Sequence, residues 1–406
     1  MQENPIYYPK KAELEERTLK LRNRLSVLDP QWSLALIISK VNQYYFTGTM
    51  QDAVYAIPRD KEATLFVRRS YERACDESPL DKIVPIPKGY RDMAEALGEK
   101  VCSSQTVYLE EEIVPVAMVH RLHHHMNFGC TKALDSIVGE LRSIKSPSEL
   151  LCMQKSGVLH AHIMNKVVPK LLREGISEAQ LATELYAAMM QNGHHGTFRL
   201  RMFDTNITPG HICFGENSLY PTSFNGPGGH RGLSPAVPSW GSETRFLRKG
   251  DLVFIDIAFG VAGYHTDKTM LYCFGGNILT GEALAAHQQC VAIEKQTARM
   301  LVPGAIPSQI YQQVMSEQTP EFLKDFMGYG NRTVPFLGHS LGLQGDETPI
   351  IAKKFDKPVE ENMVFAIEPK KGIKGIGMVG TENTYHVTPN GGHCLTDDSV
   401  DMITVE

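Results

Sequence analysis

Four acidic residues in the carboxy-terminal half occur in two pairs that strand–turn–strand segments would bring together. An apolar segment carries Asp256, a glycine-containing turn follows, and the returning segment carries Asp267. A hairpin centred between Val261 and Ala262 would place these carboxylates directly opposite one another, with Cβ atoms about 5 Å apart. Two buried carboxylates at that distance repel each other unless a cation lies between them, so the pair predicts a divalent metal ion.

The pattern recurs downstream with Glu368 and Glu382, which are equidistant from Gly375 in a glycine-rich turn, and His339 lies between the two pairs in apolar surroundings. Two Asp, two Glu and one His could hold two metal ions about 3.5–4 Å apart, as in two-metal hydrolytic sites. Taken singly, an Asp on a strand usually marks an edge or a bulge, and a lone His in an apolar loop is usually a core residue. The repetition of acid pairs on two hairpins favours the metal site.

Composition limits what kind of protein carries this site. The chain has 406 residues, for which two domains are expected, with 42% apolar and 21% charged residues, as in globular proteins. A net charge of −5 without a long basic run argues against nucleic acid and membrane as partners. We find no secretory signal, no apolar stretch near the ~20 residues of a membrane helix, and no Cys-x-x-Cys pair among eight cysteines. A cytoplasmic enzyme is therefore expected.

The elements that position the site begin after an amino-terminal α/β domain. Its segments are a helix over 12–28, strands over 34–38, 53–57, 63–67 and 107–109 with a further strand-like run at 44–46, and a helix near 93–97. The run Ser146-Pro147-Ser148-Glu149 is typical of a capping box that begins a long helix. We therefore predict domains over 1–145 and 146–406.

The second domain is expected to open with two helices. Pro169 should interrupt the end of the first helix, and Ser177 should cap the second. Glycine and proline residues then predict an irregular segment over 197–242, and long loops of this kind are often functional.

Several of these motifs resemble the creatinase, aminopeptidase P and prolidase family. The similar segments are Asn42-Gln43-Tyr44-Tyr45-Phe46-Thr47-Gly48, Ile144–Glu149, Gly250–Asp256, Gly263–Asp267, Gly338-His339, Ile367-Glu368-Pro369 and Gly380-Thr381-Glu382. The resemblance covers nearly the whole chain. It implies an α/β (α+β) protein with an amino-terminal creatinase-like domain and a carboxy-terminal pita-bread catalytic domain.

The resemblance also implies roles for the five residues Asp256, Asp267, His339, Glu368 and Glu382. They would bind two divalent ions, manganese before cobalt, zinc or iron, with Asp267 and Glu382 bridging. Glu368 and His339 would be catalytic, Glu368 as a general base for the attacking water. Relatives of this family are commonly dimers, so a homodimer is expected.

Three departures from the family pattern concern substrate binding. The Pro-His that precedes the first metal strand in peptidases is Pro238-Ser239 here, and the second His, seven residues after the metal His, is Asp346. An Arg that often precedes the last Glu by two residues is Gly380. His230 could replace the missing histidine, or be a solvated loop residue. Ser239, Asp346 and His230 are therefore the candidate substrate-binding residues.

These observations predict a dinuclear metal-dependent hydrolase, similar to Xaa-Pro dipeptidases, that cleaves an amide bond in a short peptide or small amino-acid-like molecule. One alternative is a non-peptidase member of the same fold, either a creatinase-like carbon–nitrogen hydrolase or a lyase. Another is a catalytically silent binding protein, but such a protein has no reason to keep four converging carboxylates.

Overall fold

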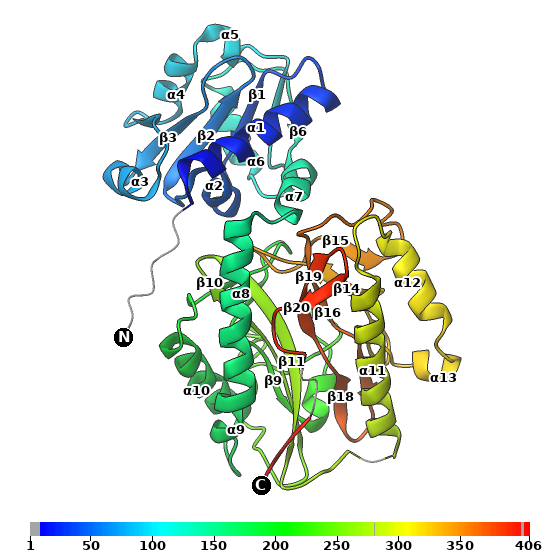
Figure 1. The fold of residues 1–406 in the computed structure, drawn as a ribbon. Helices are drawn as coiled ribbons and strands as arrows, with labels where there is room; N and C mark the ends of the chain where they lie inside the picture. Colours follow the sequence, from blue (N-terminus) through cyan, green and yellow to red (C-terminus); the bar gives the residue numbers. More distant parts are fainter. Residues whose placement is uncertain (1–8, 280, 399–401) are drawn as a thin grey trace. The chain divides into compact units, whose positions relative to one another are not determined.

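The computed structural model describes residues 9–279, 281–398 and 402–406, and the chain divides into two units, Met1–Arg142 and Ser143–Glu406 (Figure 1). A capping box lies just after this division. The Ser146 side chain accepts a hydrogen bond from the Glu149 amide, and the Glu149 side chain accepts one from the Ser146 amide. These bonds satisfy amides that the first helical turn leaves unpaired, which fixes the start of helix α8 at Pro147.

The amino-terminal unit is built on a six-stranded sheet with helices around it, as the α/β prediction requires. The strands in sheet order are β4 (Ile83–Pro85), β3 (Thr64–Arg69), β2 (Asp52–Pro58), β1 (Leu34–Ile37), β5 (Thr106–Leu109) and β6 (Cys130–Ala133). The helices are α1 (Lys11–Leu28), α2 (Lys40–Thr47), α3 (Tyr71–Glu77), α4 (Tyr90–Leu97), α5 (Glu99–Cys102), α6 (Val116–His123) and α7 (Asp135–Ser143). The strand-like prediction for residues 44–46 is wrong, because these residues lie within helix α2. Ser39 caps the start of this helix, and Gly48 ends it with a φ of 77°.

Within its described residues, the carboxy-terminal unit contains two larger sheets and three two-stranded ones. The first has the order β21 (Ile403–Val405), β11 (Tyr264–Phe274), β10 (Leu252–Val261) and β9 (Gly210–Phe214). The second has the order β15 (Glu347–Ala352), β14 (Phe336–Ser340), β16 (Val364–Ile367), β19 (Asn383–Thr388) and β20 (Gly391–Cys394). The small sheets pair β7 (Phe198–Arg199) with β8 (Asn206–Ile207), β12 (Gly328–Tyr329) with β13 (Arg332–Thr333), and β17 (Lys370–Ile373) with β18 (Gly377–Gly380).

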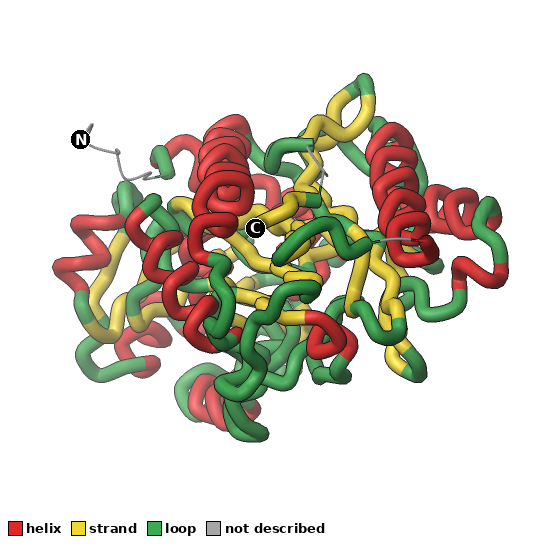
Figure 2. The backbone as a smooth tube through the Cα atoms, turned by 90° about the horizontal axis from the view of Figure 1, so that it is seen from below, coloured by secondary structure: helices red, strands yellow, loops and turns green. Residues whose placement is uncertain are grey.

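Helices lie on both sides of these sheets (Figures 1 and 2). They are α8 (Pro147–His162), α9 (Val168–Leu171), α10 (Glu178–Gln191), α11 (Gly281–Met300), α12 (Pro307–Ser316) and α13 (Pro320–Leu323). Apolar residues of α8 to α10 and of the π-helical turn Ile163–Val167 pack on the sheet of β9, β10 and β11. Residues of α11 and α12 pack on the sheet of β14, β16 and β19. The predicted interruption before Pro169 is confirmed as that π-helical turn.

The first predicted hairpin forms with a different register. Val261 pairs with Tyr264, so the turn is Ala262-Gly263, and both of its residues have positive φ as a two-residue hairpin turn requires. Asp256 therefore faces Thr269 rather than Asp267, and the prediction of directly opposed aspartates is wrong. The error equals two positions along one strand, so both carboxylates still project from the same face as diagonal neighbours.

The second predicted hairpin has the expected register, centred on Gly375. Lys370 pairs with Gly380 in the β17–β18 ladder, and Ile367 pairs with Asn383 in the β16–β19 ladder. Both strands are interrupted at the acids, so Glu368 and Glu382 lie between two short ladders instead of inside one long strand. An isolated bridge from Thr269 to Glu382 connects the two hairpins.

The prediction of an irregular segment over 197–242 is wrong in part. Residues 210–214 form strand β9, which pairs with β10 so that His211 lies beside Asp256. The cause is tertiary, since β9 is a short strand whose pairing partner lies about forty residues later in the chain.

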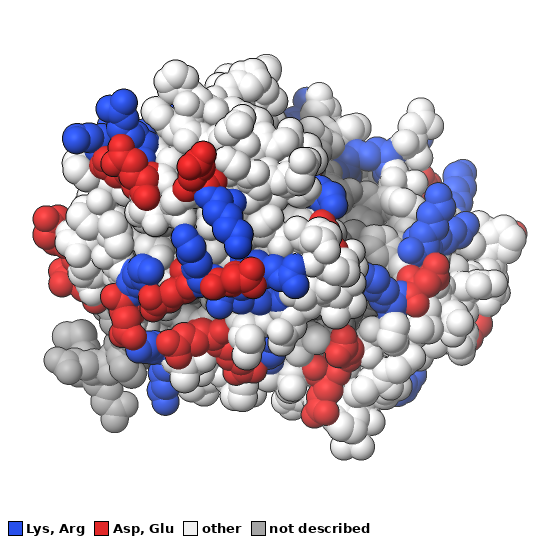
Figure 3. Space-filling model, turned by 90° about the horizontal axis from the view of Figure 1, so that it is seen from above, with Lys and Arg blue, Asp and Glu red and all other residues white. Residues whose placement is uncertain are grey.

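No helix among the described residues is long and apolar enough to cross a membrane. On the face shown in Figure 3, basic and acidic side chains are interspersed. Ion pairs at the surface include Arg68 with Asp52 at 2.7 Å. Such exposed pairs contribute little to stability, but they keep either sign of charge from dominating.

Candidate metal centre

The structure brings all five predicted ligands together in the carboxy-terminal unit. Ligand atoms of Asp267, His339 and Glu382 lie within 4.8 Å of one another. The Nε2 atom of His339 lies 3.5 Å from Oε1 of Glu368. Asp256 joins the group through Lys370, whose ammonium contacts it and both glutamates. Strands β10, β11 and β14 and the interrupted strands of the second hairpin thus converge on one buried cluster.

His339 is held in an orientation suited to metal binding. Its Nδ1 lies 3.1 Å from the carbonyl oxygen of Ser340, to which Nδ1–H can donate. That tautomer leaves the lone pair of Nε2 directed at the carboxylates, as in histidine ligands whose other nitrogen is bonded to a carbonyl. The strand around it is tightly packed, because a Cβ on Gly338 would lie 2.2 Å from the carbonyl oxygen of Ala366.

Asp267 and Glu382 are fixed by threonines from neighbouring strands. The backbone amide of Asp267 donates to Thr384 Oγ1 at 2.8 Å, and Thr384 Oγ1 donates to the Asp267 carbonyl at 2.9 Å. Thr269 Oγ1 donates to Glu382 Oε2 at 2.9 Å. The two residues predicted to bridge are therefore positioned by bonds that cross between the hairpins.

Lys370 is the unexpected member of the cluster. Its Nζ donates to Asp256 Oδ2 at 3.1 Å, to Glu368 Oε2 at 3.0 Å and to Glu382 Oε2 at 2.6 Å. The residue begins strand β17, two positions after Glu368, and is fully buried. The sequence analysis missed it because a lysine beside an acidic strand end is usually a surface residue.

Burial and mutual repulsion set the protonation behaviour of the cluster. Burial, then Asp256, raise the pKa of Asp267 to about 8, and burial raises the pKa of Glu382 and of Glu368 as well. Burial acts to lower the pKa of Lys370, but the neighbouring carboxylates outweigh it and hold that pKa well above its ordinary value. Burial likewise acts to lower the pKa of His339, but the charges of Asp346 and Glu368 outweigh it, so this pKa is raised. The acids thus need cations beside them to be fully ionised near neutral pH.

The predicted substrate-binding residues differ in position. Asp346 lies beside the cluster with Oδ1 3.7 Å from His339 Nε2, and its Oδ2 has no hydrogen-bond partner among the described residues. His230 is buried, and burial lowers its pKa, although the charge of Asp256 acts to raise it. Ser239 is half-buried, and its carbonyl accepts a hydrogen bond from the Leu233 amide.

His211 is a second residue that the sequence analysis missed. Its ring lies 4.3 Å from the ring of His230, centroid to centroid, and neither of its ring nitrogens has a partner within the part of the chain that the structure describes. Burial lowers its pKa well below the ordinary value, so the imidazole is neutral. The only sequence signal was its position two residues after a proline in a segment predicted to be irregular.

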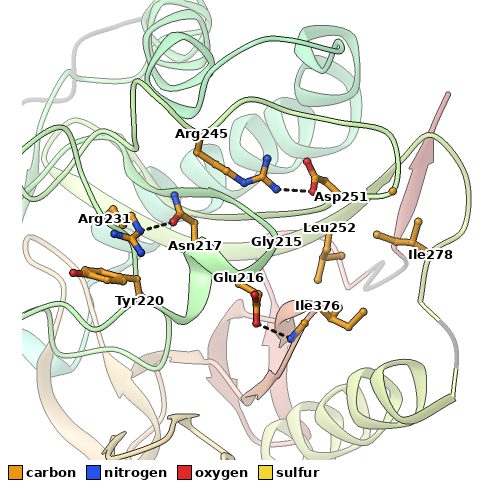
Figure 4. Close-up of a pocket in the computed structure, with 12 residues that line it drawn as sticks. Gly215, Glu216, Asn217, Tyr220, Arg231, Arg245, Asp251, Leu252, Ile278 and Ile376 are labelled. Atoms are coloured by element: carbon orange, nitrogen blue, oxygen red, sulfur yellow. Dashed lines mark hydrogen bonds and ion pairs between the residues drawn. The ribbon is translucent and has the colours of Figure 1, made fainter.

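A separate polar pocket of about 320 Å³ lies around the turn of the second hairpin (Figure 4). Arg231 donates to Asn217 and stacks on Tyr220, and Arg245 is paired with Asp251. None of its lining residues belongs to the carboxylate cluster. Glu216 accepts a hydrogen bond from the Gly375 amide, so each of these charged side chains already has a partner in the protein.

Comparison with known proteins places these features in a family. Residues 151–389 match the model of metallopeptidase family M24, and residues 17–144 match the creatinase/prolidase N-terminal domain. An Xaa-Pro dipeptidase of Pyrococcus furiosus is 27% identical over 372 residues, covering 90% of this chain and 94% of that protein. The prolidase structure from Pyrococcus furiosus is 25% identical with a TM-score of 0.71, covering 93% of this chain and 99% of that one. The Pyrococcus horikoshii OT3 prolidase structure is 22% identical with a TM-score of 0.76, covering 96% and 100%.

Proposed function

Because the chain belongs to metallopeptidase family M24, we propose that it is a divalent-metal-dependent hydrolase that cleaves the amide bond of an Xaa-Pro dipeptide or a similar small amino-acid-like substrate. The observation that carries the proposal is the convergence of Asp267, His339 and Glu382 beside Glu368 in one buried cluster. The relative named Xaa-Pro dipeptidase, which aligns over most of both chains, supports the substrate class.

The donor set suits a divalent cation. Carboxylate oxygens with one imidazole favour manganese, with cobalt, zinc and iron as alternatives. A divalent ion in this position supplies Lewis-acid polarisation of the scissile carbonyl and makes hydroxide available near neutral pH. The resemblance to the family implies two ions, and a second ion would also require Asp256, whose Oδ2 accepts a hydrogen bond from Lys370.

Glu368 is the residue we propose as general base. Its Oε1 faces His339, while its Oε2 is held by the Lys370 ammonium. Burial raises its pKa, which brings the carboxylate closer to the proton affinity that a base working near neutral pH needs. His339 is the proposed partner that orients this carboxylate and contributes an imidazole ligand.

On the substrate side, we propose roles for His230 and Asp346. The His211–His230 pair supplies neutral imidazoles near Asp256, suited to hydrogen bonds with a peptide carbonyl or carboxylate. The Oδ2 of Asp346, which has no partner in the described parts of the chain, is suited to a donor such as a substrate amine. Ser239 is the third proposed substrate-binding residue, because it occupies the position at which peptidases of this family carry histidine. A homodimer and a cytoplasmic location belong to the same proposal.

The test is hydrolysis of Xaa-Pro dipeptides by the full chain after loading with manganese or cobalt. We expect turnover that is lost with a chelator and restored by metal, and an Asp267→Ala variant that neither binds metal nor turns over substrate. Asp346→Asn should retain metal but bind the dipeptide more weakly. Metal binding without dipeptide turnover, together with turnover of a creatine-like compound, would favour the carbon–nitrogen hydrolase alternative. Normal activity in Asp267→Ala would refute the assignment of the site.

A further inference from the structure

The Lys370 ammonium uses every donor it has within the carboxylate cluster. A lysine ammonium has three N–H groups, and Nζ makes three hydrogen bonds, to Asp256, Glu368 and Glu382. No donor is left for substrate. Surrounded by three carboxylates, the ammonium acts as a cation that neutralises part of their charge.

Backbone contacts fix the position of Lys370. The residue is 0% exposed, its carbonyl accepts a hydrogen bond from the Met327 amide at 2.7 Å, and it pairs with Gly380 across the hairpin. A Cβ on Gly380 would lie 2.6 Å from Lys370 Cα and 2.3 Å from the Pro369 carbonyl oxygen, so only glycine allows the two strands to approach this closely. The side chain is thus enclosed where it stands.

Both geometry and charge argue that the Lys370 ammonium and a second metal ion cannot occupy this place together. The three N···O distances are 2.6–3.1 Å, whereas carboxylate oxygens bind magnesium or zinc at about 2.0–2.2 Å. An ammonium and a divalent ion cannot both contact the same oxygens of Asp256 and Glu382 without strong repulsion in a buried site. Four ionised carboxylates carry four negative charges. One divalent ion and one ammonium would offset three of them and leave a net charge of −1. Two divalent ions and one hydroxide would leave the same net charge.

We infer that this chain binds one divalent ion, at Asp267, His339 and Glu382, and that the Lys370 ammonium permanently takes the place of a second ion beside Asp256. The inference rests on the proposed metal-dependent function and restricts it to a one-metal form. Lys370 acts on the reaction through the carboxylates it holds, as a positioning residue.

The experiment measures how many ions each chain binds. The full-length protein is stripped with a chelator, dialysed against excess manganese, washed, and analysed by inductively coupled plasma mass spectrometry. Lys370→Met removes the charge and keeps a side chain of similar length. Lys371→Met is the matched control, because Lys371 is also nearly buried on β17 but donates to the carbonyls of Phe322 and Lys324, outside the cluster.

We expect one manganese per chain in the parent protein and in Lys371→Met, and two in Lys370→Met. Two ions in the parent would overturn the inference and leave the proposed function intact. No ion in the parent would overturn the proposed function itself. One ion in both the parent and a folded Lys370→Met would also overturn the inference, because Lys370 would then not be what limits the count.

A measurement on the parent protein keeps the inference testable if Lys370→Met does not fold. Two manganese ions sharing carboxylates are exchange-coupled and give a broad multiline electron paramagnetic resonance spectrum, whereas an isolated ion gives six lines. We expect the six-line spectrum of an isolated ion at every manganese concentration up to saturation. A coupled spectrum at saturation would overturn the inference.

Discussion

Asp267→Asn should change how the stability of the metal-free protein depends on pH. Burial raises the pKa of Asp267 from its ordinary value of 3.8 to about 8, so the folded protein binds this proton more tightly than the unfolded chain does. The stability that this group contributes is therefore present at low pH and is lost as pH rises toward 8. Asparagine has nearly the same shape but does not titrate, so the variant lacks this loss.

The magnitude follows from proton linkage. Each pH unit between the unfolded and folded pKa values costs about 1.4 kcal/mol, and from pH 6 to pH 8 the loss for this group is about 2 kcal/mol. Buried histidines such as His194 and His195, whose pKa burial lowers to about 3, give the opposite slope up to about pH 6.5. They are the same in both proteins, so their contribution cancels in the difference between the two proteins.

The assay is urea unfolding in a chelator at about pH 6 and pH 8, followed by tryptophan fluorescence. The chain has two tryptophans, one in each unit, and Trp32→Phe in both proteins leaves Trp240 to report on the carboxy-terminal unit. We expect the parent to lose about 2 kcal/mol more than the Asp267→Asn variant between these pH values. Equal slopes in the two proteins, or a parent that gains stability relative to the variant, would refute the reasoning.

Three further predictions concern stability. Gly157→Ala should cost about 3 kcal/mol, because its Cβ would lie 2.0 Å from the Leu395 carbonyl oxygen, whereas Val158→Ala on the exposed side of the same helix should be nearly neutral in urea unfolding. Ser146→Ala should cost about 1 kcal/mol by the same measurement, since it removes the cap of α8; no change would show the cap to be redundant. Glu110→Ala should cost about 2–4 kcal/mol, followed by Trp32 fluorescence, because buried amide donors lose their acceptor, and Glu110→Gln should restore part of it.

The two hairpins show what local pattern can and cannot predict. Glycine spacing placed the centre of the second hairpin correctly, because Gly375 lies in a turn that few other residues could form. In the first hairpin, the turn is Ala262-Gly263. Alanine rarely adopts a positive φ such as the 52° of Ala262, so the sequence did not indicate this residue as part of the turn. The face of each aspartate was still predicted correctly, since a two-residue error preserves the alternation of side chains.

Contacts between distant segments account for what the sequence analysis missed. His211 became part of the site because β9 pairs with β10, and that pairing depends on packing against helices α8 to α10. Lys370 could not be predicted as a buried cation, because its three acidic partners come from positions 256, 368 and 382. The acidic residues and the histidine that could bind metal were recognisable from the sequence. The lysine ammonium that balances their charge is brought to them only by the assembled fold.

The bridge between Thr269 and Glu382 has a consequence for how the protein is made. On the ribosome, the aspartate hairpin is complete more than a hundred residues before Glu382 is synthesised. His339 and Glu368 are synthesised before it, but until Glu382 follows, the cluster lacks its last predicted ligand and Thr269 has no partner at the bridge. The cluster is thus completed by Glu382, the last of its five predicted ligands to be translated, and tight capture of a metal ion would mark a late stage of folding in this unit.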